Sequence, residues 1–230
     1  PNGIPSHDTL SDVLGRIDPV AFRAAFTAWA TAALPDLAGE QICIDGKAIR
    51  GSREGDNPAV HLVSAFAGRA RWVLAQQAVA EKSNEITAIP DLLGLLDLAG
   101  AVVSIDAMGC QKDIAGQIVE QKGHYVLAVK ENQPGLHEVI KEMFDELTTR
   151  GIVGSRHRFH EDIDAGHGRI ETRRIWTSDW IEWYQNREQW ADLGSFVCVE
   201  SVREMDGKTS TERRYFISDL DGSDPVAMLA

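Results

Sequence analysis

Apolar residues recur along the chain with the two periods that separate helices from strands. Helical spacing is clearest over residues 18–34, where Phe22, Phe26 and Trp29 share one face behind an Asp–Pro start. Further helices are predicted at 8–17, 85–98, 110–122, 134–149 and a tryptophan-rich stretch at 179–191. Apolar or alternating runs predict strands at 42–45, 61–67, 71–79, 101–106, 124–129, 156–163, 169–177, 196–205 and 212–218.

The order of these elements is strand, hairpin, helix, strand, helix, strand, helix and then a β-rich region. Strand–helix–strand units imply parallel strands, and the hairpin adds antiparallel ones. We therefore expect a mixed sheet of about five strands flanked by helices. The stretch 46–58 carries charges and glycines and is expected to be a loop. From about residue 155 the chain becomes β-rich.

Charge narrows the class of protein. The chain of 230 residues has a net charge of −12, which argues against a simple nucleic-acid-binding module, because such modules are usually basic. Residues 136–230 hold 12 basic and 19 acidic side chains. Any binding of DNA must therefore come from local basic patches or from sequence outside this chain. No apolar run reaches the roughly 20 residues of a membrane span, and no signal-peptide pattern is present. We expect a cytoplasmic protein without a membrane partner.

Two of the predicted buried strands end in an aspartate, Asp45 and Asp106. Functional groups in α/β sheets collect beyond the carboxyl ends of the strands, and two carboxylates held there repel each other unless a cation neutralises them. Oxygen ligands suit Mg²⁺ or Mn²⁺, and such ions can clamp the attacking and leaving oxygens of a phosphoryl displacement. An aspartate at a strand end also often only caps the next turn. Spacing alone therefore indicates a metal-dependent phosphotransferase or nuclease as one interpretation.

The residues around these aspartates are more specific than their spacing. Six segments occur in order: ICIDGKAIRGS (42–52), EKSNEITAIPDLL (81–93), VVSIDAMGCQKDIA (102–115), YVLAVKENQP (125–134), GHGRIETR (166–173) and RRYFISDL (213–220). Together they resemble the DDE transposases of insertion sequences, in particular the group containing the H-repeat-associated proteins found beside Rhs elements. The resemblance covers essentially the whole chain.

The resemblance implies an α/β fold: a ribonuclease H-like mixed sheet flanked by helices, with a β-rich insertion in the C-terminal third. It implies an N-terminal helical associated region (1–38), a catalytic core (39–150) and the insertion (151–230), with the core resuming beyond the chain end. The implied activity is cleavage of DNA at transposon ends and strand transfer to target DNA with Mg²⁺ or Mn²⁺, by a homo-oligomer on DNA. Asp45 and Asp106 match the first two catalytic aspartates and would bind the metal.

The third acidic residue of this family usually lies on a helix after a β-rich insertion, in a motif of the kind Tyr–Arg–Glu–Lys. No such motif occurs in the chain, so the resemblance implies a glutamate beyond Ala230. Within the chain the best substitute is Glu171, whose neighbours Arg169, Arg173 and Arg174 could hold DNA phosphates. A solvent-facing glutamate is the alternative interpretation.

Polar residues near the same edge are candidates for contact with DNA. The first set follows Asp45 and suits phosphate neutralisation: Lys47, Arg50 and Arg53. The second set follows the strand at 124–129 and suits phosphate or base-edge contacts: Lys130, Asn132 and Gln133. A solvated basic loop and a turn before Pro134 are the respective alternatives. Glu85, at a polar helix start, is a weaker candidate, and Cys110 lacks the partnered histidine of a cysteine nucleophile.

Two hypotheses about function remain open. The first is a transposase, for which a nuclease on the same fold is the nearest alternative; cutting without joining would distinguish the nuclease. The second is a catalytically dead transposase remnant that at most binds DNA or a partner protein. The missing third carboxylate and the acidic balance of residues 136–230 motivate this second hypothesis.

Overall fold

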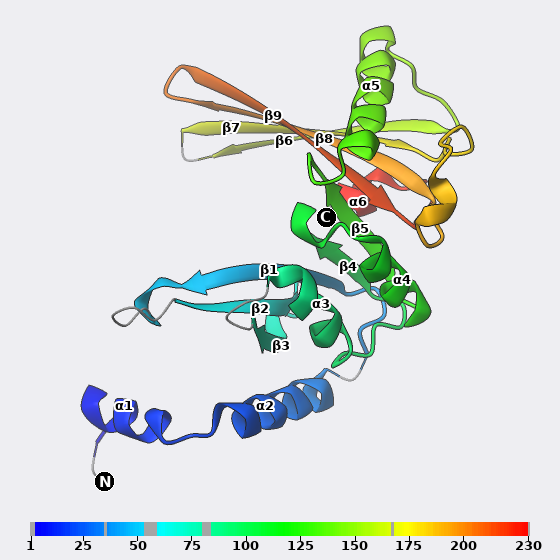
Figure 1. The fold of residues 1–230 in the computed structure, drawn as a ribbon. Coiled ribbons are helices and arrows are strands. Elements are labelled where there is room, and N and C mark those ends of the chain that lie inside the picture. Colours follow the sequence, from blue (N-terminus) through cyan, green and yellow to red (C-terminus); the bar gives the residue numbers. More distant parts are fainter. Residues whose placement is uncertain (1–2, 35, 53–58, 80–83, 167, 230) are drawn as a thin grey trace.

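The computed structural model describes residues 3–34, 36–52, 59–79, 84–166 and 168–229. Within these ranges the strands form one mixed sheet in the order β3-β2-β1-β4-β5-β9-β8-β7-β6 (Figure 1). The strands are β1 (Gln41–Ile49), β2 (Val60–Ala67), β3 (Trp72–Ala78), β4 (Val102–Ile105), β5 (His124–Val129), β6 (His157–Gly166), β7 (Arg169–Ser178), β8 (Ser195–Met205) and β9 (Lys208–Ser218). The sheet is larger than the five strands expected, because β9 pairs with β5 and the β-rich third continues the same sheet.

Of the helices in the described residues, two precede the sheet in the chain, three lie in the connections between its strands, and one follows the last strand. They are α1 (His7–Gly15), α2 (Pro19–Ala33), α3 (Glu85–Leu93), α4 (Lys112–Glu120), α5 (Pro134–Arg150) and α6 (Pro225–Leu229). The start signals predicted for α2 are present, since Asp18 accepts a hydrogen bond from the Ala21 amide and Pro19 opens the helix. In the described ranges, no helix combines the length and apolar content that crossing a bilayer requires.

The two faces of the sheet differ. On one face, alternate residues of the parallel strands β1, β4 and β5 are buried: Ile42, Ile44, Val103, Ile105, Tyr125, Leu127 and Val129. Because α3, α4 and α5 cover this side (Figure 1), we call it the helix face. The alternation of side chains places the remaining residues on the opposite face. We call it the carboxylate face and define it by Cys43, Asp45, Ser104 and Ala128.

Two predicted boundaries and one predicted helix were wrong. The stretch 46–58 is not all loop: β1 continues to Ile49 because residues 46–49 pair with residues 60–63 of β2. The helix expected over 85–98 ends at Leu93, where turns follow. No α-helix forms over 179–191, where only Arg187–Gln189 form a 3-10 helix. Tyr184 and Trp190 of this segment join the core, whereas Trp180 and Trp183 are exposed.

A chain of ion pairs crosses the helix face of β6–β9. Arg174 on β7 bridges Glu161 on β6 (2.6 Å) and Glu200 on β8 (3.0 Å). Glu200 also accepts from Arg213 on β9 (2.7 Å), which reaches Asp145 on α5 (2.9 Å). Glu200 is only 7% exposed. We call these five residues the charge ladder. They link the four strands and α5, and the four strand residues lie directly opposite one another in the sheet register.

β5 and β9 are held together beyond their backbone pairing. The Asp219 carboxylate, just after β9, accepts from the Tyr125 amide and contacts His124 Nδ1, both at 2.6 Å. Ser218 Oγ donates to the Tyr125 carbonyl at 2.7 Å. Gly194, which precedes β8, donates its amide to the Ser218 carbonyl at 2.8 Å. These bonds therefore hold the start of β8 as well as the end of β9 in place.

We predict that Gly194→Ala strongly destabilises the fold. A Cβ at this position would lie 2.3 Å from the Asp219 carbonyl oxygen and 2.7 Å from that of Leu220. These backbone atoms cannot move aside without distorting the chain, so we expect a loss of about 3 kcal/mol in the free energy of unfolding. The control is Gly116→Ala in α4, where the space is open and about 0.5–1 kcal/mol should be gained. Urea denaturation of both variants tests this, and equal midpoints would contradict it.

We also predict that Glu200→Gln destabilises the protein in a pH-dependent way. Burial raises the pKa of Glu200, but hydrogen bonds from Arg213 and Arg174 together outweigh it and leave the pKa below its ordinary value of 4.5. A lowered carboxyl pKa stabilises the fold above pH 4.5, and this contribution is lost as the pH falls through the lowered value. The variant should lose about 2 kcal/mol at pH 7.

The measurement compares urea denaturation of Glu200→Gln and the wild type between pH 7 and pH 3. The gap between the two free energies of unfolding should close as the pH falls below 4.5. Glu138→Gln, at an exposed position of α5, controls for loss of a surface charge. A gap that stays constant over this range would refute the role given to Glu200.

Candidate active site at the carboxyl edge of the sheet

The structure brings Asp45 and Asp106 to neighbouring positions. β1 and β4 are parallel and adjacent, with Ile44 directly opposite Ile105, and each aspartate follows its isoleucine. Neighbouring strands lie about 4.8 Å apart. Because both isoleucines point to the helix face, side-chain alternation turns both aspartates to the carboxylate face. Both carboxylates are exposed at the carboxyl edge of the parallel strands.

The two aspartates differ in their local bonds. Asp106 Oδ1 accepts from the Met108 amide at 3.1 Å, so this side chain caps the 3-10 helix Ala107–Gly109 that begins the path to α4. Asp45 has no hydrogen bond or ion pair to any residue that the structure describes. One oxygen of Asp106 therefore caps the following turn, as the alternative interpretation of a strand-end aspartate expected. Asp45 has no such capping role.

The donor set of this pair suits a hydrated hard cation. Mg²⁺ retains several waters and is commonly bound through one or two carboxylates, and Asp45 and Asp106 supply two. Over the described ranges, no group of three histidine, cysteine, aspartate or glutamate side chains is close enough to hold a metal ion. The pair thus fits the protein's share of a magnesium or manganese site, and a third protein ligand is absent from the described part of the chain.

Two lysines flank the aspartates on the same side of the sheet. Lys47 lies two residues beyond Asp45 on β1, and Lys130 directly follows β5. Alternation turns both toward the carboxylate face, and both are exposed. Arg50 lies farther along, in a 3-10 helix after β1. Arg53 lies outside the described residues. Lys47 and Lys130 are thus placed to neutralise a phosphate near the two aspartates.

Asn132 and Gln133 have bonding partners within the protein. The Asn132 side-chain amide donates to the carbonyl of Ala107, and that of Gln133 donates to the carbonyl of Cys110 at 3.0 Å. Both carbonyls belong to the turn that follows Asp106. These side chains tie the β5–α5 turn to the turn of the second aspartate, an arrangement that positions Asp106.

Glu85 lies closer to this edge than the sequence suggests. Its carboxylate lies 2.7 Å from His61 Nε2 and is only 12% exposed. It lies over Gly46, where an added Cβ would come within 2.1 Å of the carboxyl group. Gly46 points to the helix face, so Glu85 is separated from Asp45 by the thickness of the sheet. The glycine directly after Asp45 was the sequence signal for this close approach.

The structure does not bring Glu171 to the two aspartates. Glu171 lies on β7, three strand spacings or about 14 Å from β5. Register aligns Val129 of β5 with Trp176 of β7, and Glu171 lies five residues farther on, about 17 Å along the strand. Its nearest cations are Arg169 (3.4 Å) and Arg173 (3.7 Å), while Arg174 points to the helix face and belongs to the charge ladder.

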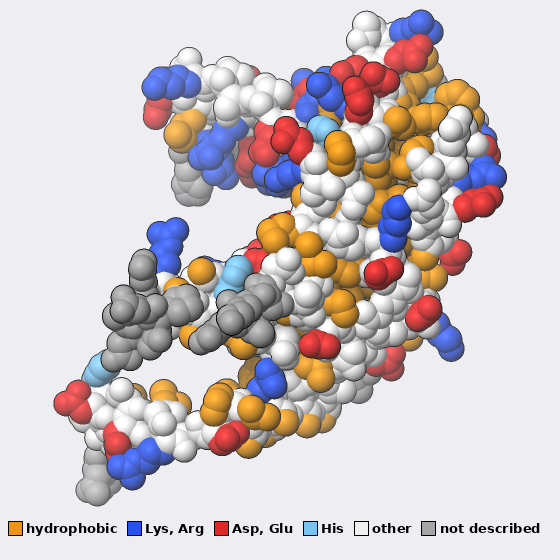
Figure 2. Space-filling view, in the orientation of Figure 1, with side chains coloured by type: hydrophobic (Ala, Val, Ile, Leu, Met, Phe, Trp, Pro, Cys, Tyr) orange, Lys and Arg blue, Asp and Glu red, His pale blue; other side chains and the backbone are white. Residues whose placement is uncertain are grey.

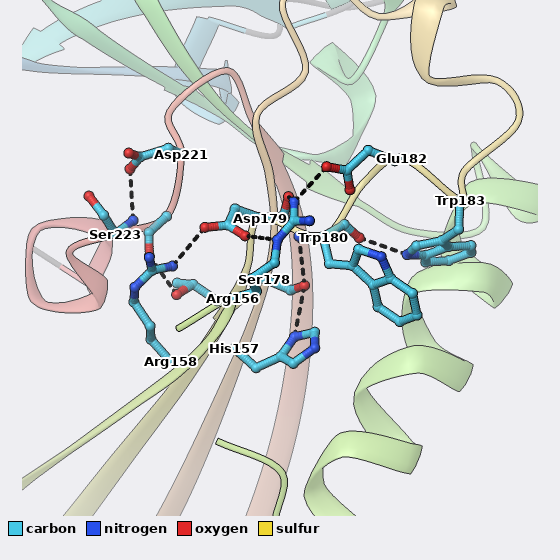
Figure 3. A network of polar contacts seen from close by, with 12 residues as sticks. Arg156, His157, Arg158, Ser178, Asp179, Trp180, Glu182, Trp183, Asp221 and Ser223 are labelled. Carbon is cyan, nitrogen blue, oxygen red and sulfur yellow. Dashed lines mark hydrogen bonds and ion pairs between the residues drawn. The ribbon is translucent and has the colours of Figure 1, made fainter. Parts of the chain in front are cut away.

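Other candidate chemistry lies elsewhere or is inert. Burial raises the pKa of the Cys110 thiol to about 12, so this cysteine is not a nucleophile at neutral pH. A cavity of about 570 Å³ lies at the opposite edge of the sheet. Beside it, Arg156 binds Asp179 and Glu182, and Arg158 also binds Asp179 (Figure 3). These ion pairs fasten the 179–194 segment to β6 and have no contact with the aspartate pair.

Short central strands leave the aspartates at the floor of a notch. β4 has 4 residues and β5 has 6, whereas β1 has 9 and both β8 and β9 have 11. The long strands therefore project past the carboxyl edge on both sides of the short ones. Figure 2 shows the molecule hollowed on its left side, below the projecting ends of β6–β9. A polymer that reached Asp45 and Asp106 would be flanked by both.

Comparison with known proteins gives a consistent result. Residues 37–189 match the family model described as "Transposase DDE domain". A Xanthobacter autotrophicus protein, "Uncharacterized protein in dhlA 3'region", is 47% identical over 94% of this chain and 73% of its own length. "Putative transposase YncI" of Escherichia coli O157:H7 is 42% identical, and "H repeat-associated putative transposase YhhI" of strain K12 is 36% identical, each over 96% of this chain. The chain spans 57% and 59% of the lengths of the last two relatives.

We predict that Asn132→Ala destabilises the turn beside Asp106 whereas Lys130→Ala does not. Without the Asn132 amide, the buried Ala107 carbonyl loses its side-chain donor, which should cost about 1–2 kcal/mol. Lys130 is exposed and has no ion pair among the described residues. Urea denaturation measures both effects. If Lys130→Ala lost as much stability as Asn132→Ala, the positioning role of Asn132 would be wrong.

Proposed function

The chain belongs to the family of transposases with a DDE domain, and we propose that it cleaves DNA phosphodiesters at transposon ends and transfers the freed 3′ hydroxyl to target DNA with a divalent metal. The observation that carries this proposal is the placement of Asp45 and Asp106 side by side at one exposed edge. Membership of this family supports DNA cleavage and strand transfer as the reaction of that pair. The resemblance to a ribonuclease H-like core over 39–150, with an insertion over 151–230, belongs to the same proposal.

Each residue of the edge has a role that its position allows. Asp45 and Asp106 would hold Mg²⁺ or Mn²⁺, and Asp106 would be kept in place by its bond to the Met108 amide. When bound, such ions stabilise the charge that develops on the attacking and leaving oxygens. Lys47 and Lys130 would bind the phosphates on either side of the cleaved bond. Asn132 and Gln133 would act indirectly, through the turn that carries Asp106.

The third metal-binding carboxylate is proposed to come from chain that follows residue 230 in a longer protein. Two observations support this. The matched relatives YncI and YhhI are longer than this chain, which spans 57% and 59% of them. Glu171, the alternative within the chain, is separated from Asp45 by several strands. We also propose that the enzyme acts as a homo-oligomer on paired transposon ends.

A second candidate function has one observation in its favour. In the described part of the chain the aspartate pair has no third acidic neighbour suited to a metal, as expected for a transposase remnant that binds DNA without cutting it. The two candidates differ in outcome: only the enzyme yields cut and joined DNA products. A nuclease on the same fold would yield cut products alone.

We predict that Asp45→Asn and Asp106→Asn each abolish DNA cleavage without unfolding the protein. Each change removes one metal-binding charge, which should slow cleavage about a thousandfold, the effect of several kcal/mol in the transition state. An asparagine at 106 can still accept the Met108 hydrogen bond, so the fold should survive. The assay uses the longer protein that also contains the chain after residue 230, and it follows cleavage and joining of plasmid DNA carrying the element's own ends in Mg²⁺ or Mn²⁺.

The control is Asp91→Asn, which removes an exposed carboxylate from α3 and should leave cleavage unchanged. Thermal denaturation confirms that all three variants are folded. Full cleavage by Asp45→Asn would show that this aspartate is not a metal ligand. A wild-type protein that binds DNA but gives no products would favour the remnant over the enzyme.

A further inference from the structure

The strands β6–β9 continue well past the end of β5, and their two faces carry different charges. We call this projecting part the arm and define it as residues 160–166, 168–175 and 199–214. Register aligns Ala128 of β5 with Phe216 of β9, so the carboxylate face continues onto the arm. Side-chain alternation then assigns every strand residue of the arm to one face or the other.

On the helix face of the arm the arginines are already neutralised. Arg174 and Arg213 are held by the carboxylates of the charge ladder at 2.6–3.0 Å. A guanidinium engaged in this way has few donors left for a ligand. This face is therefore a structural surface of the arm.

On the carboxylate face the cations outnumber the acids. Strands β7, β8 and β9 carry five cations there: Arg169, Arg173, Arg203, Lys208 and Arg214. They carry two carboxylates, Glu171 and Glu212, and Glu212 is taken up by Arg214 at 2.9 Å. The edge strand β6 adds Asp162 and Asp164. The excess of positive charge therefore lies on the three inner strands.

Glu171 is the centre of the remaining cluster. Arg169 and Arg173 lie two residues to either side of it on β7, at 3.4 and 3.7 Å, and Arg203 is its direct partner on β8. These separations are longer than a charge-assisted hydrogen bond. One carboxylate thus faces three guanidiniums, and neither Arg203 nor Lys208 has an acidic partner within ion-pair distance among the described residues. The arginine donors remain available to an anionic ligand.

We propose that this face of the arm binds the phosphate backbone of DNA that enters the notch, with Arg169, Arg173 and Arg203 as the contacts. The choice of DNA as the ligand rests on the proposed function. The cluster lies on the same side of the sheet as Asp45, Asp106 and Lys130, and about 10–23 Å beyond the end of β5. Glu171 spaces the arginines and is not a metal ligand. This arm is the local basic patch that an acidic chain needs to hold DNA.

The first test measures binding of the full chain to a 30-base-pair fluorescein-labelled duplex in EDTA by fluorescence anisotropy. Arg173→Gln combined with Arg203→Gln removes two phosphate contacts, so the slope of log K against log salt should become shallower by about 1.8. The defect in affinity should then be about tenfold larger at 50 mM than at 200 mM salt. The matched control, Lys141→Gln with Arg150→Gln on exposed positions of α5, removes the same charge and should keep the wild-type slope.

The second test is Glu171→Gln. If Glu171 lies among phosphate-binding arginines, removing its negative charge strengthens binding to the same duplex in EDTA. Loss of cleavage with unchanged affinity in EDTA would instead make Glu171 a metal ligand and overturn the inference. An arginine double variant with the same salt slope as the α5 control would also overturn it.

The outcomes separate this inference from the proposed function. If the longer protein that contains the third carboxylate binds DNA through the arm but yields no cut DNA, the enzymatic proposal fails and the DNA-binding face stands. If the wild type cuts DNA and the arginine double variant binds it as the wild type does, the enzyme stands and the arm is not the binding face.

Discussion

The antiparallel pairing of β5 with β9 is the constraint on which the rest of this structure depends. It joins the parallel strands that carry the aspartates to the four antiparallel strands that follow α5. Asp219 and Ser218 add three side-chain bonds to this joint, and Gly194 ties β8 to it. Because one sheet has one continuous pair of faces, this joint decides that the arm and Asp45 share a side.

Differences in strand length convert that continuous sheet into a site. A sheet with strands of equal length would present a flat edge, and its aspartates would stand in open solvent. Here β4 and β5 end early while β1, β8 and β9 continue, so the edge that bears Asp45 and Asp106 is recessed. The turns after β4 and β5 are also fastened to each other by Asn132 and Gln133. The two turns at the base of the recess are therefore tied to each other, and longer strands border them on both sides.

The sequence predicted local features well and long-range pairing poorly. The strand at 124–129 and the run that ends at Asp106 were correctly placed, because apolar runs and their polar ends are local signals. The family was also correctly identified from ordered motifs. The single large sheet was missed, because the pairing of Val126 with Ser218 joins residues far apart in the chain. The separation of Glu171 from Asp45 could not be predicted for the same reason, because it depends on strand order, which no local pattern encodes.

The acidic composition of the chain misleads about DNA only if charges are averaged over a region. Residues 136–230 are strongly acidic in sum. Many of their carboxylates nevertheless form ion pairs with arginines inside the fold, as in the charge ladder and the pairs of Asp179 and Glu182 with Arg156. Strand alternation then sorts what remains onto two faces. Arg173 and Arg174 are adjacent in the sequence and point to opposite sides, one beside Glu171 and the other into the ladder. The charge that a DNA strand would contact is therefore the charge of one face of the arm, and the net charge of the chain does not predict it.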